Sequence, residues 1–149
     1  MRVTLSLRGD YAVRAMLALA QHAVSIEGGA EGSGGSTRLL SAARIAERMR
    51  IPGRFVAHVL ADLRHAGLVI GSTGRSGGYR LALPAERIDL LRIVDAAEPH
   101  DAAARCVLRG IPCDPIGRCA VHDAFGSATA ALRAELASKT LAGLVARPE

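Results

Sequence analysis

Residues 41–82 read SAARIAERMRIPGRFVAHVLADLRHAGLVIGSTGRSGGYRLA. Apolar residues recur at helical spacing in two short runs, which predicts one helix over 41–49 and a second over 54–65. Ser41 is a residue type favoured at a helix N-cap. Residues 51–53 predict a tight turn between the helices, because proline stops a helix and glycine accepts unusual backbone angles.

Two short strands are expected directly after these helices, over 68–72 and 78–82. Residues 73–77 read TGRSG, a glycine-rich run typical of a β-hairpin. Gly67 is expected to be the left-handed cap at the end of the preceding helix. Two helices joined by a tight turn and followed by a hairpin predict a winged helix-turn-helix, a mainly α (α+β) fold.

Further segments flank this motif. A helix is expected from Asp10, as its N-cap, to Ala23, and another over 90–97 with Asp89 as its cap. Residues 26–38 are mostly Gly, Ser and Glu, which predicts a flexible loop.

The last expected helix covers 119–137 and carries an apolar stripe. A winged helix has no internal surface for this stripe, so we expect it to form a homodimer interface. The predicted organisation is a DNA-binding domain over 1–98, a cysteine cluster loop over 99–118, and a dimerisation helix with a C-terminal tail over 119–149. The stripe consists of Val121, Ala124, Phe125, Ala128, Leu132 and Leu136.

The formal net charge is +5, and the same excess is found between residues 44 and 80, where seven arginines stand against two acids. A local basic field attracts polyanions, so double-stranded DNA is the expected partner.

No apolar run approaches a membrane span, and Arg8 and Asp10 interrupt any signal peptide. We therefore expect a cytoplasmic protein with no membrane partner. The chain has no phosphate-binding glycine motif, so we do not expect an enzyme.

In a helix-turn-helix the second helix enters the major groove, and its early residues meet base edges. Arg54 and His58, one turn apart, occupy those positions. Arginine suits a bidentate contact with guanine, and a phosphate contact is the alternative for Arg54. Arg75 at the hairpin tip is expected to reach the adjacent minor groove or its phosphates. Ser41 and Arg64 complete the predicted DNA-binding residues.

The cysteines of the chain are Cys106, Cys113 and Cys119. Their odd number argues against a disulfide scaffold and favours metal or redox chemistry. Thiolates hold iron–sulfur clusters, and three-cysteine sets also bind zinc. A thiol–disulfide switch is a third alternative, and three unligated cysteines, kept after a cluster was lost, are a fourth. His122 follows Cys119 by three residues, so we expect both on one helix face.

Motifs are spread along the chain: MRVT at 1–4, DYAVRAM at 10–16, IAER at 45–48, GLV at 67–69, GGYRL at 77–81, IVDAAE at 93–98 and TLA at 140–142. Together they resemble the Rrf2-type winged-helix transcription regulators, a family that includes the iron–sulfur assembly regulator IscR and the nitric-oxide sensor NsrR. The resemblance implies a homodimer, palindromic operators and, as the commoner habit, repression. Family members often carry Arg-Gly at the start of the wing turn, where this chain has Thr73 and Gly74.

The cysteine spacing resembles the cluster loop of that family, which implies an iron–sulfur cluster on the three thiolates. Two candidates for a fourth ligand stay open: His122, as in the assembly regulators, or Asp10 from the partner subunit, as in the nitric-oxide sensors. The choice bears on whether the cluster is 2Fe–2S or 4Fe–4S. The predicted function is a transcription repressor whose operator affinity follows redox state, nitric oxide or iron supply. The alternative is a winged-helix regulator without a cluster, sensing through thiols or zinc.

Overall fold

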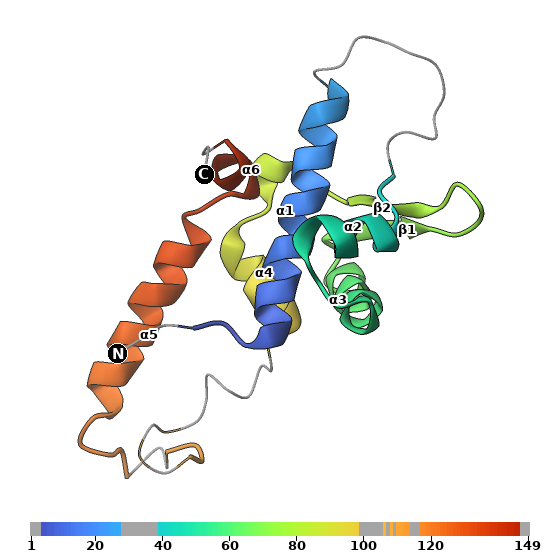
Figure 1. The fold of residues 1–149 in the computed structure, drawn as a ribbon. Coiled ribbons are helices and arrows are strands. Elements are labelled where there is room, and N and C mark those ends of the chain that lie inside the picture. The colour runs from blue at the N-terminus through green and yellow to red at the C-terminus, as the bar shows by residue number, and fades with distance from the viewer. Residues whose placement is uncertain are drawn as a thin grey trace.

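The structure is a computed structural model that describes residues 4–27, 39–98, 106, 108, 110–113 and 117–146. Figure 1 shows α1 at the centre, with α2, α3 and the β-hairpin on one side and α5 standing along the other. In chain order the elements are α1 (Leu7–Glu27), α2 (Ala42–Met49), α3 (Gly53–His65), β1 (Val69–Ser72), β2 (Gly78–Leu81), the 3-10 helix η1 (Ala85–Arg87), α4 (Leu90–Ala97), α5 (His122–Ala137) and α6 (Leu141–Val145).

Helix α1 is the central element, and it packs against α2, α3, α4 and α6. The prediction that it begins with Asp10 as N-cap is wrong. The hydroxyl of Ser6 accepts a hydrogen bond from the Gly9 N–H at 3.1 Å, which is the geometry of an N-cap, and Asp10 lies inside the first turn. The helix also continues to Glu27, past its predicted end at Ala23 and past the start of the expected loop at 26.

The helix-turn-helix agrees with the prediction. Ser41 caps α2, because its side chain accepts a hydrogen bond from the Arg44 N–H at 3.3 Å. Helix α3 begins at Gly53, one residue before the expected start. Its end is closed by Gly67, which has a φ of 70°. The Leu68 N–H donates back to the Leu63 carbonyl at 2.9 Å, which completes a Schellman motif.

Strands β1 and β2 form the expected antiparallel hairpin, with Val69 opposite Leu81 and Ser72 opposite Gly78. A bridge that the sequence did not suggest extends this sheet. Leu40 exchanges backbone hydrogen bonds of 2.9 and 2.8 Å with Tyr79, so the residues before α2 pair with β2. These elements confirm the winged helix-turn-helix.

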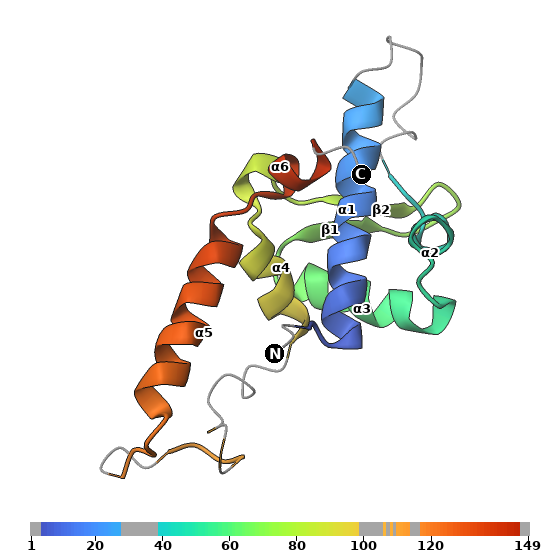
Figure 2. The same cartoon turned by 60° about the vertical axis from the view of Figure 1, so that its left-hand side comes forward.

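The C-terminal helix begins later than expected, and a further helix follows it. Helix α5 starts at His122 rather than at 119, and a separate helix, α6, follows it. Leu141 of α6 is completely buried, and its N–H donates to the Ile88 carbonyl at 2.7 Å. Figure 2 shows α6 beside the upper half of α1. The chain thus returns to the winged helix after α5.

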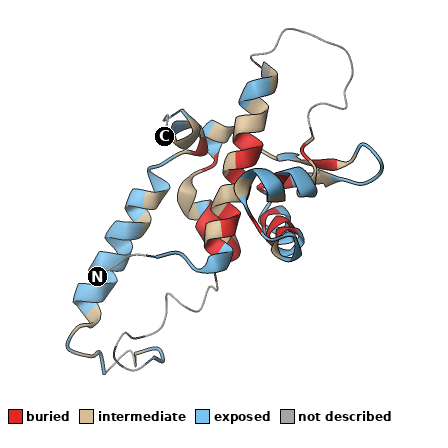
Figure 3. Cartoon of the chain, viewed as in Figure 1, coloured by how far each residue is buried: buried red, intermediate tan, exposed pale blue. Residues whose placement is uncertain are grey.

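The core is formed by α1, α3, α4 and the inner residues of the wing, as the buried segments in Figure 3 show. In contrast, α5 contains no buried residue. No helix in the described ranges combines the length and the apolar character that a membrane span needs. Residues 28–38 of the loop predicted over 26–38, and most of the predicted cluster loop at 99–118, lie outside the described residues.

Candidate DNA-binding surface and cysteine centre

Helix α3 turns its charged side to solvent and its apolar side to the core. Arg54, His58 and Arg64 are exposed. Arg54 and His58 are four residues apart and therefore lie one turn from each other along the exposed face. The side chains on the opposite face are buried: Val56, Val59, Leu60 and Leu63.

The start of α3 is held against α1 by aromatic contacts. The rings of Phe55 and Tyr11 have centroids 5.5 Å apart. The guanidinium carbon of Arg54 lies 4.9 Å from the centroid of the Phe55 ring, a cation–π contact. The residues expected to read DNA thus stand on a helix start that is fixed to the core.

Helix α2 carries two further arginines, Arg44 and Arg48, which are not among the residues predicted to bind DNA. Arg44 and Arg48 are exposed and line, with His22, Leu40 and Glu47, a groove of about 260 Å³. Ser41 uses its oxygen to cap the helix, so its hydroxyl proton is available to donate to a phosphate. The spacing of four residues between the two arginines, on a helix opened by a serine cap, is the signal that points to them.

Arg75 lies at the tip of the wing and is exposed. The turn around it needs glycine on both sides. Gly74 has a φ of 106°, and a Cβ at Gly77 would clash with the Ser72 carbonyl oxygen. The Gly77 N–H donates to the Gly74 carbonyl at 3.0 Å, which closes the turn and leaves Arg75 at its outer end.

The three cysteine side chains converge on one point. The Sγ atoms of Cys106, Cys113 and Cys119 all lie within 4.8 Å of one another, and each side chain is half-buried. Among the described residues they form the one group of three or more potential metal ligands. A tight turn positions the first of them: the Gly110 N–H donates to the Cys106 carbonyl at 2.8 Å, and Gly110 has a φ of 69°.

The donor set fits a metal that prefers sulfur. Three thiolates around one tetrahedral ion, with metal–sulfur bonds of about 2.3 Å, would lie about 3.8 Å apart. The Cys106 and Cys119 sulfurs are 3.4 Å apart. The hydrogen bond from the Cys106 thiol, and then desolvation, raise the pKa of Cys119, whereas the Val121 backbone lowers it. A metal cation favours the deprotonated thiolate and therefore opposes the rise.

Neither candidate for a fourth ligand belongs to this group within one chain. His122 is the first residue of α5, and its N–H donates to the Cys119 carbonyl at 3.0 Å. Because Cys119 precedes the helix, the expectation that the two residues share a helix face is wrong. Asp10 forms an ion pair with Arg14 at 3.0 Å. Its role as a ligand from a partner subunit stays a prediction.

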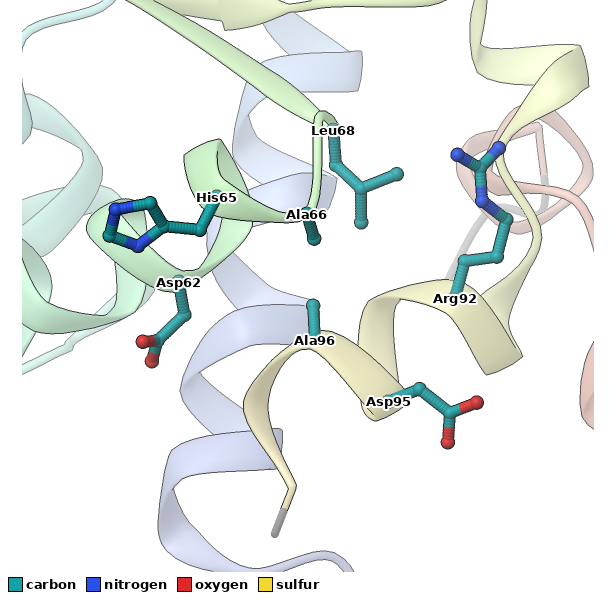
Figure 4. Close-up of a pocket in the computed structure, with 7 residues that line it drawn as sticks. All are labelled: Asp62, His65, Ala66, Leu68, Arg92, Asp95 and Ala96. Atoms are coloured by element: carbon teal, nitrogen blue, oxygen red, sulfur yellow. The ribbon is translucent and has the colours of Figure 1, made fainter. Parts of the chain in front are cut away.

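A cavity of about 430 Å³ lies where the end of α3 meets α4 (Figure 4). Asp62 and Asp95 lie on opposite sides of it, and both carboxylates are already engaged. Asp62 pairs with Arg8 of α1 and Asp95 pairs with Arg133 of α5. The cavity therefore marks the junction where ion pairs from α1 and α5 reach α3 and α4.

The chain is similar to known transcription regulators over almost its whole length. A model of the Rrf2 family, described as iron-dependent transcriptional regulators, matches residues 5–147. An HTH-type transcriptional regulator of Neisseria meningitidis is 32% identical over 141 residues, which is 95% of this chain and 86% of that protein. Protein rrf2 of Nitratidesulfovibrio vulgaris is 30% identical over 141 residues, again 95% of this chain and 86% of the relative.

Solved structures give the same result. The structure of T. potens IscR matches with a TM-score of 0.70 at 27% identity and covers 96% of this chain and 86% of that one. The match includes the winged helix and extends into the C-terminal helices. This chain belongs to the Rrf2 family and is a transcriptional regulator.

Proposed function

We propose that this chain is a DNA-binding transcriptional repressor of the cytoplasm whose operator affinity is controlled by an iron–sulfur cluster on Cys106, Cys113 and Cys119. The observation that carries this proposal is the grouping of three thiols, the side chains that hold iron–sulfur clusters, in the segment that joins the winged helix to α5. The family description as iron-dependent regulators and the likeness to IscR support it.

The DNA-binding roles follow from exposure and position. Arg54 and His58 read base edges in the major groove, and Arg75 reaches the minor groove beside it. We call α3 the reading helix, because it carries the side chains that meet the bases. Ser41 and Arg64 bind backbone phosphates on its two sides, and they fix its register on the DNA. All four charged or ionisable side chains are exposed, as contact with DNA requires.

The exposed apolar stripe of α5 supports a homodimer as part of this proposal. Phe125 and Leu132, both of the apolar stripe, are each 38% exposed, and none of the residues of α5 is buried within the chain. A second copy that packs its own α5 against this face would cover the stripe and pair two reading helices for a palindromic operator.

The cysteine residues hold the cluster, and either His122 or Asp10 of the partner subunit completes its ligands. When bound, such a cluster supplies a group that changes with redox state, reacts with nitric oxide and is lost when iron is short. Holding it fixes the three cysteines and hence the approach of α5 to the winged helix. The position of α5 set by the three cysteines would then favour one spacing of the two reading helices in the dimer.

Iron and acid-labile sulfide analysis of anaerobically purified protein tests the cluster. Equal amounts of iron and sulfide, with visible absorption, are expected.

The DNA-binding part of the proposal is tested by titrating palindromic duplexes, selected from a random pool, at several salt concentrations. Affinity should fall steeply with salt because each phosphate contact releases counterions. Colourless, iron-free protein would overturn the cluster, and salt-independent binding would overturn the DNA contacts.

A second candidate is a regulator that senses through its thiols or through zinc. The Cys106 and Cys119 sulfurs lie 3.4 Å apart, and a disulfide requires them to move to about 2.05 Å. An oxidant that takes two electrons and two protons from these thiols would form that bond. Zinc without sulfide in the purified protein, or a disulfide in place of bound iron, would favour this candidate.

A further inference from the structure

The first turn of α1 is capped by a residue from another helix. In a capping box, the N-cap serine is followed three positions later by a glutamate that accepts a hydrogen bond from the serine N–H. Here Ser6 is the N-cap, but the third position is Gly9. The Ser6 N–H instead donates to the Glu98 carboxylate at 2.9 Å. Glu98, at the end of α4, therefore takes the part of the missing glutamate.

Gly9 leaves the space that the Glu98 carboxylate occupies in this contact. A Cβ at position 9 would clash with Glu98 Oε1 and would lie 3.3 Å from its Cδ. The absence of a side chain lets the carboxylate approach the positive end of α1, where a negative charge is favoured. A side chain at position 9 would therefore force the Glu98 carboxylate to move.

Glu98 also adjoins the cysteine segment. It is the C-cap of α4, with its N–H bonded to the Val94 carbonyl at 2.9 Å, and it precedes Cys106 by eight residues in the sequence. A displacement of Cys106 that is transmitted along the chain reaches α4 at Glu98, because Glu98 is the C-cap of that helix.

The same turn of α1 is fixed to the reading helix. Arg8 donates two hydrogen bonds of 2.7 Å to the two carboxylate oxygens of Asp62 in α3. The side chain of Asp62 is only 19% exposed, and a two-point contact sets orientation as well as distance. Asp62 stands one turn after His58 on that helix.

We propose that Glu98 is a positioning residue that couples the cysteine centre to the reading helix through the first turn of α1. The route, which rests on the proposed function, runs from Glu98 to Ser6, the N-cap of α1, and from Arg8 in the same turn to Asp62. A change at the cysteines that displaces Glu98 frees this turn and lets α3 shift relative to α1. Coupling of this kind needs an element with two arrangements, and the capped or uncapped turn supplies it.

The test measures the ratio of two dissociation constants, for iron-loaded and for metal-free protein, by anisotropy with a selected palindromic duplex. The first variant is Gly9→Ala, which displaces Glu98 but puts a better helix former into α1. Its control is Gly126→Ala in α5, where a Cβ would have no neighbour within 4 Å. Wild type and control should show a ratio of about ten, and Gly9→Ala a ratio near one with unchanged iron content.

Two further variants separate coupling from folding. Glu98→Gln keeps an oxygen that accepts from the Ser6 N–H and should retain much of the ratio, whereas Glu98→Ala should lose it. Asp62→Asn breaks the far end of the route, remote in sequence from the cysteines, and should also lower the ratio toward one. Melting curves of all the variants show whether the fold is intact.

The outcomes distinguish the two proposals. A wild-type ratio near ten that Gly9→Ala, Glu98→Ala and Asp62→Asn all leave unchanged overturns the coupling route and leaves the proposed function standing. A wild-type ratio of one overturns the proposed function, and the route falls with it.

Discussion

Arg133 of α5 donates two hydrogen bonds, of 2.9 and 2.7 Å, to the two carboxylate oxygens of Asp95 in α4. The neighbouring carboxylate raises the pKa of Arg133, so the pair stays charged. Helix α5 has no buried residue, and this two-point ion pair is a specific contact between it and the winged helix. It therefore contributes to the angle at which α5 leaves the domain.

Replacing Asp95 by Asn should loosen α5 because one of the two charged acceptors becomes an amide nitrogen. We expect backbone amides of α5 to exchange hydrogen several-fold faster, while those of α1 keep their rates. Glu135→Gln is the control, since Glu135 pairs with Lys139 close by in sequence rather than with another helix. Equal exchange in wild type and Asp95→Asn would contradict a role for the pair in holding α5.

Leu141→Ala should destabilise the winged helix. The side chain of Leu141 is completely buried, so its truncation leaves a cavity and should lower the free energy of unfolding by about 3 kcal/mol. Leu144, on the same short helix, is only partly buried, and Leu144→Ala should cost less. Urea unfolding measures both. A loss as small for Leu141 as for Leu144 would mean that α6 is not a fixed part of the domain.

The double variant Phe125→Ala, Leu132→Ala should weaken the proposed homodimer, because both side chains are exposed on α5 and belong to its apolar stripe. Sedimentation at several protein concentrations should show monomer where the wild type is dimeric. Val24→Ala removes an exposed apolar side chain from α1 and should leave the association unchanged. If the double variant associates as wild type does, another surface forms the dimer.

Arg54→Ala and Arg75→Ala should affect DNA binding in different ways. A base contact of Arg54 supplies about 1–3 kcal/mol of discrimination, so Arg54→Ala should bind a selected duplex and its single-base variants more equally. Loss of a phosphate or minor-groove contact at Arg75 should weaken binding to all duplexes and reduce the salt slope by about one. Competition binding on a panel of duplexes separates the two effects, and the reverse pattern would exchange the assigned roles.

Local patterns predicted the helices and strands of the winged helix well because each carries its own boundary signals. Ser41, Gly67 and Asp89 are residue types that cap helices by contacts within a few positions, and the structure shows those contacts. Val69 and Leu81 are held in register by a turn whose glycines are visible in the sequence.

The errors arose where distant residues decide the outcome. Asp10 has a good side chain for an N-cap, but Ser6 takes the position, supported by Glu98 from α4. Helix α6 has only five residues, too few for a periodic pattern, and it forms because Leu141 is buried beside Ile88. The bridge between Leu40 and Tyr79 likewise joins segments far apart in the chain.

The candidate site was predictable in its residues but not in its geometry. Three cysteines close in sequence indicate metal or redox chemistry, whereas their convergence within 4.8 Å depends on the turn at Gly110 and on the start of α5. Arg44 and Arg48 were missed because net charge identifies a basic segment without showing which of its arginines share a groove.

The central claim is tested most directly by operator titrations of wild type and Cys113→Ala, both purified without oxygen, with iron, sulfide and visible absorption measured on the same samples. We predict coloured wild type, a colourless Cys113→Ala protein with an unchanged melting temperature, and dissociation constants that differ about ten-fold. Ser127→Ala on the exposed surface of α5 should behave as wild type. A coloured Cys113→Ala protein with normal iron content, or one that binds the operator as the wild type does, would contradict the account.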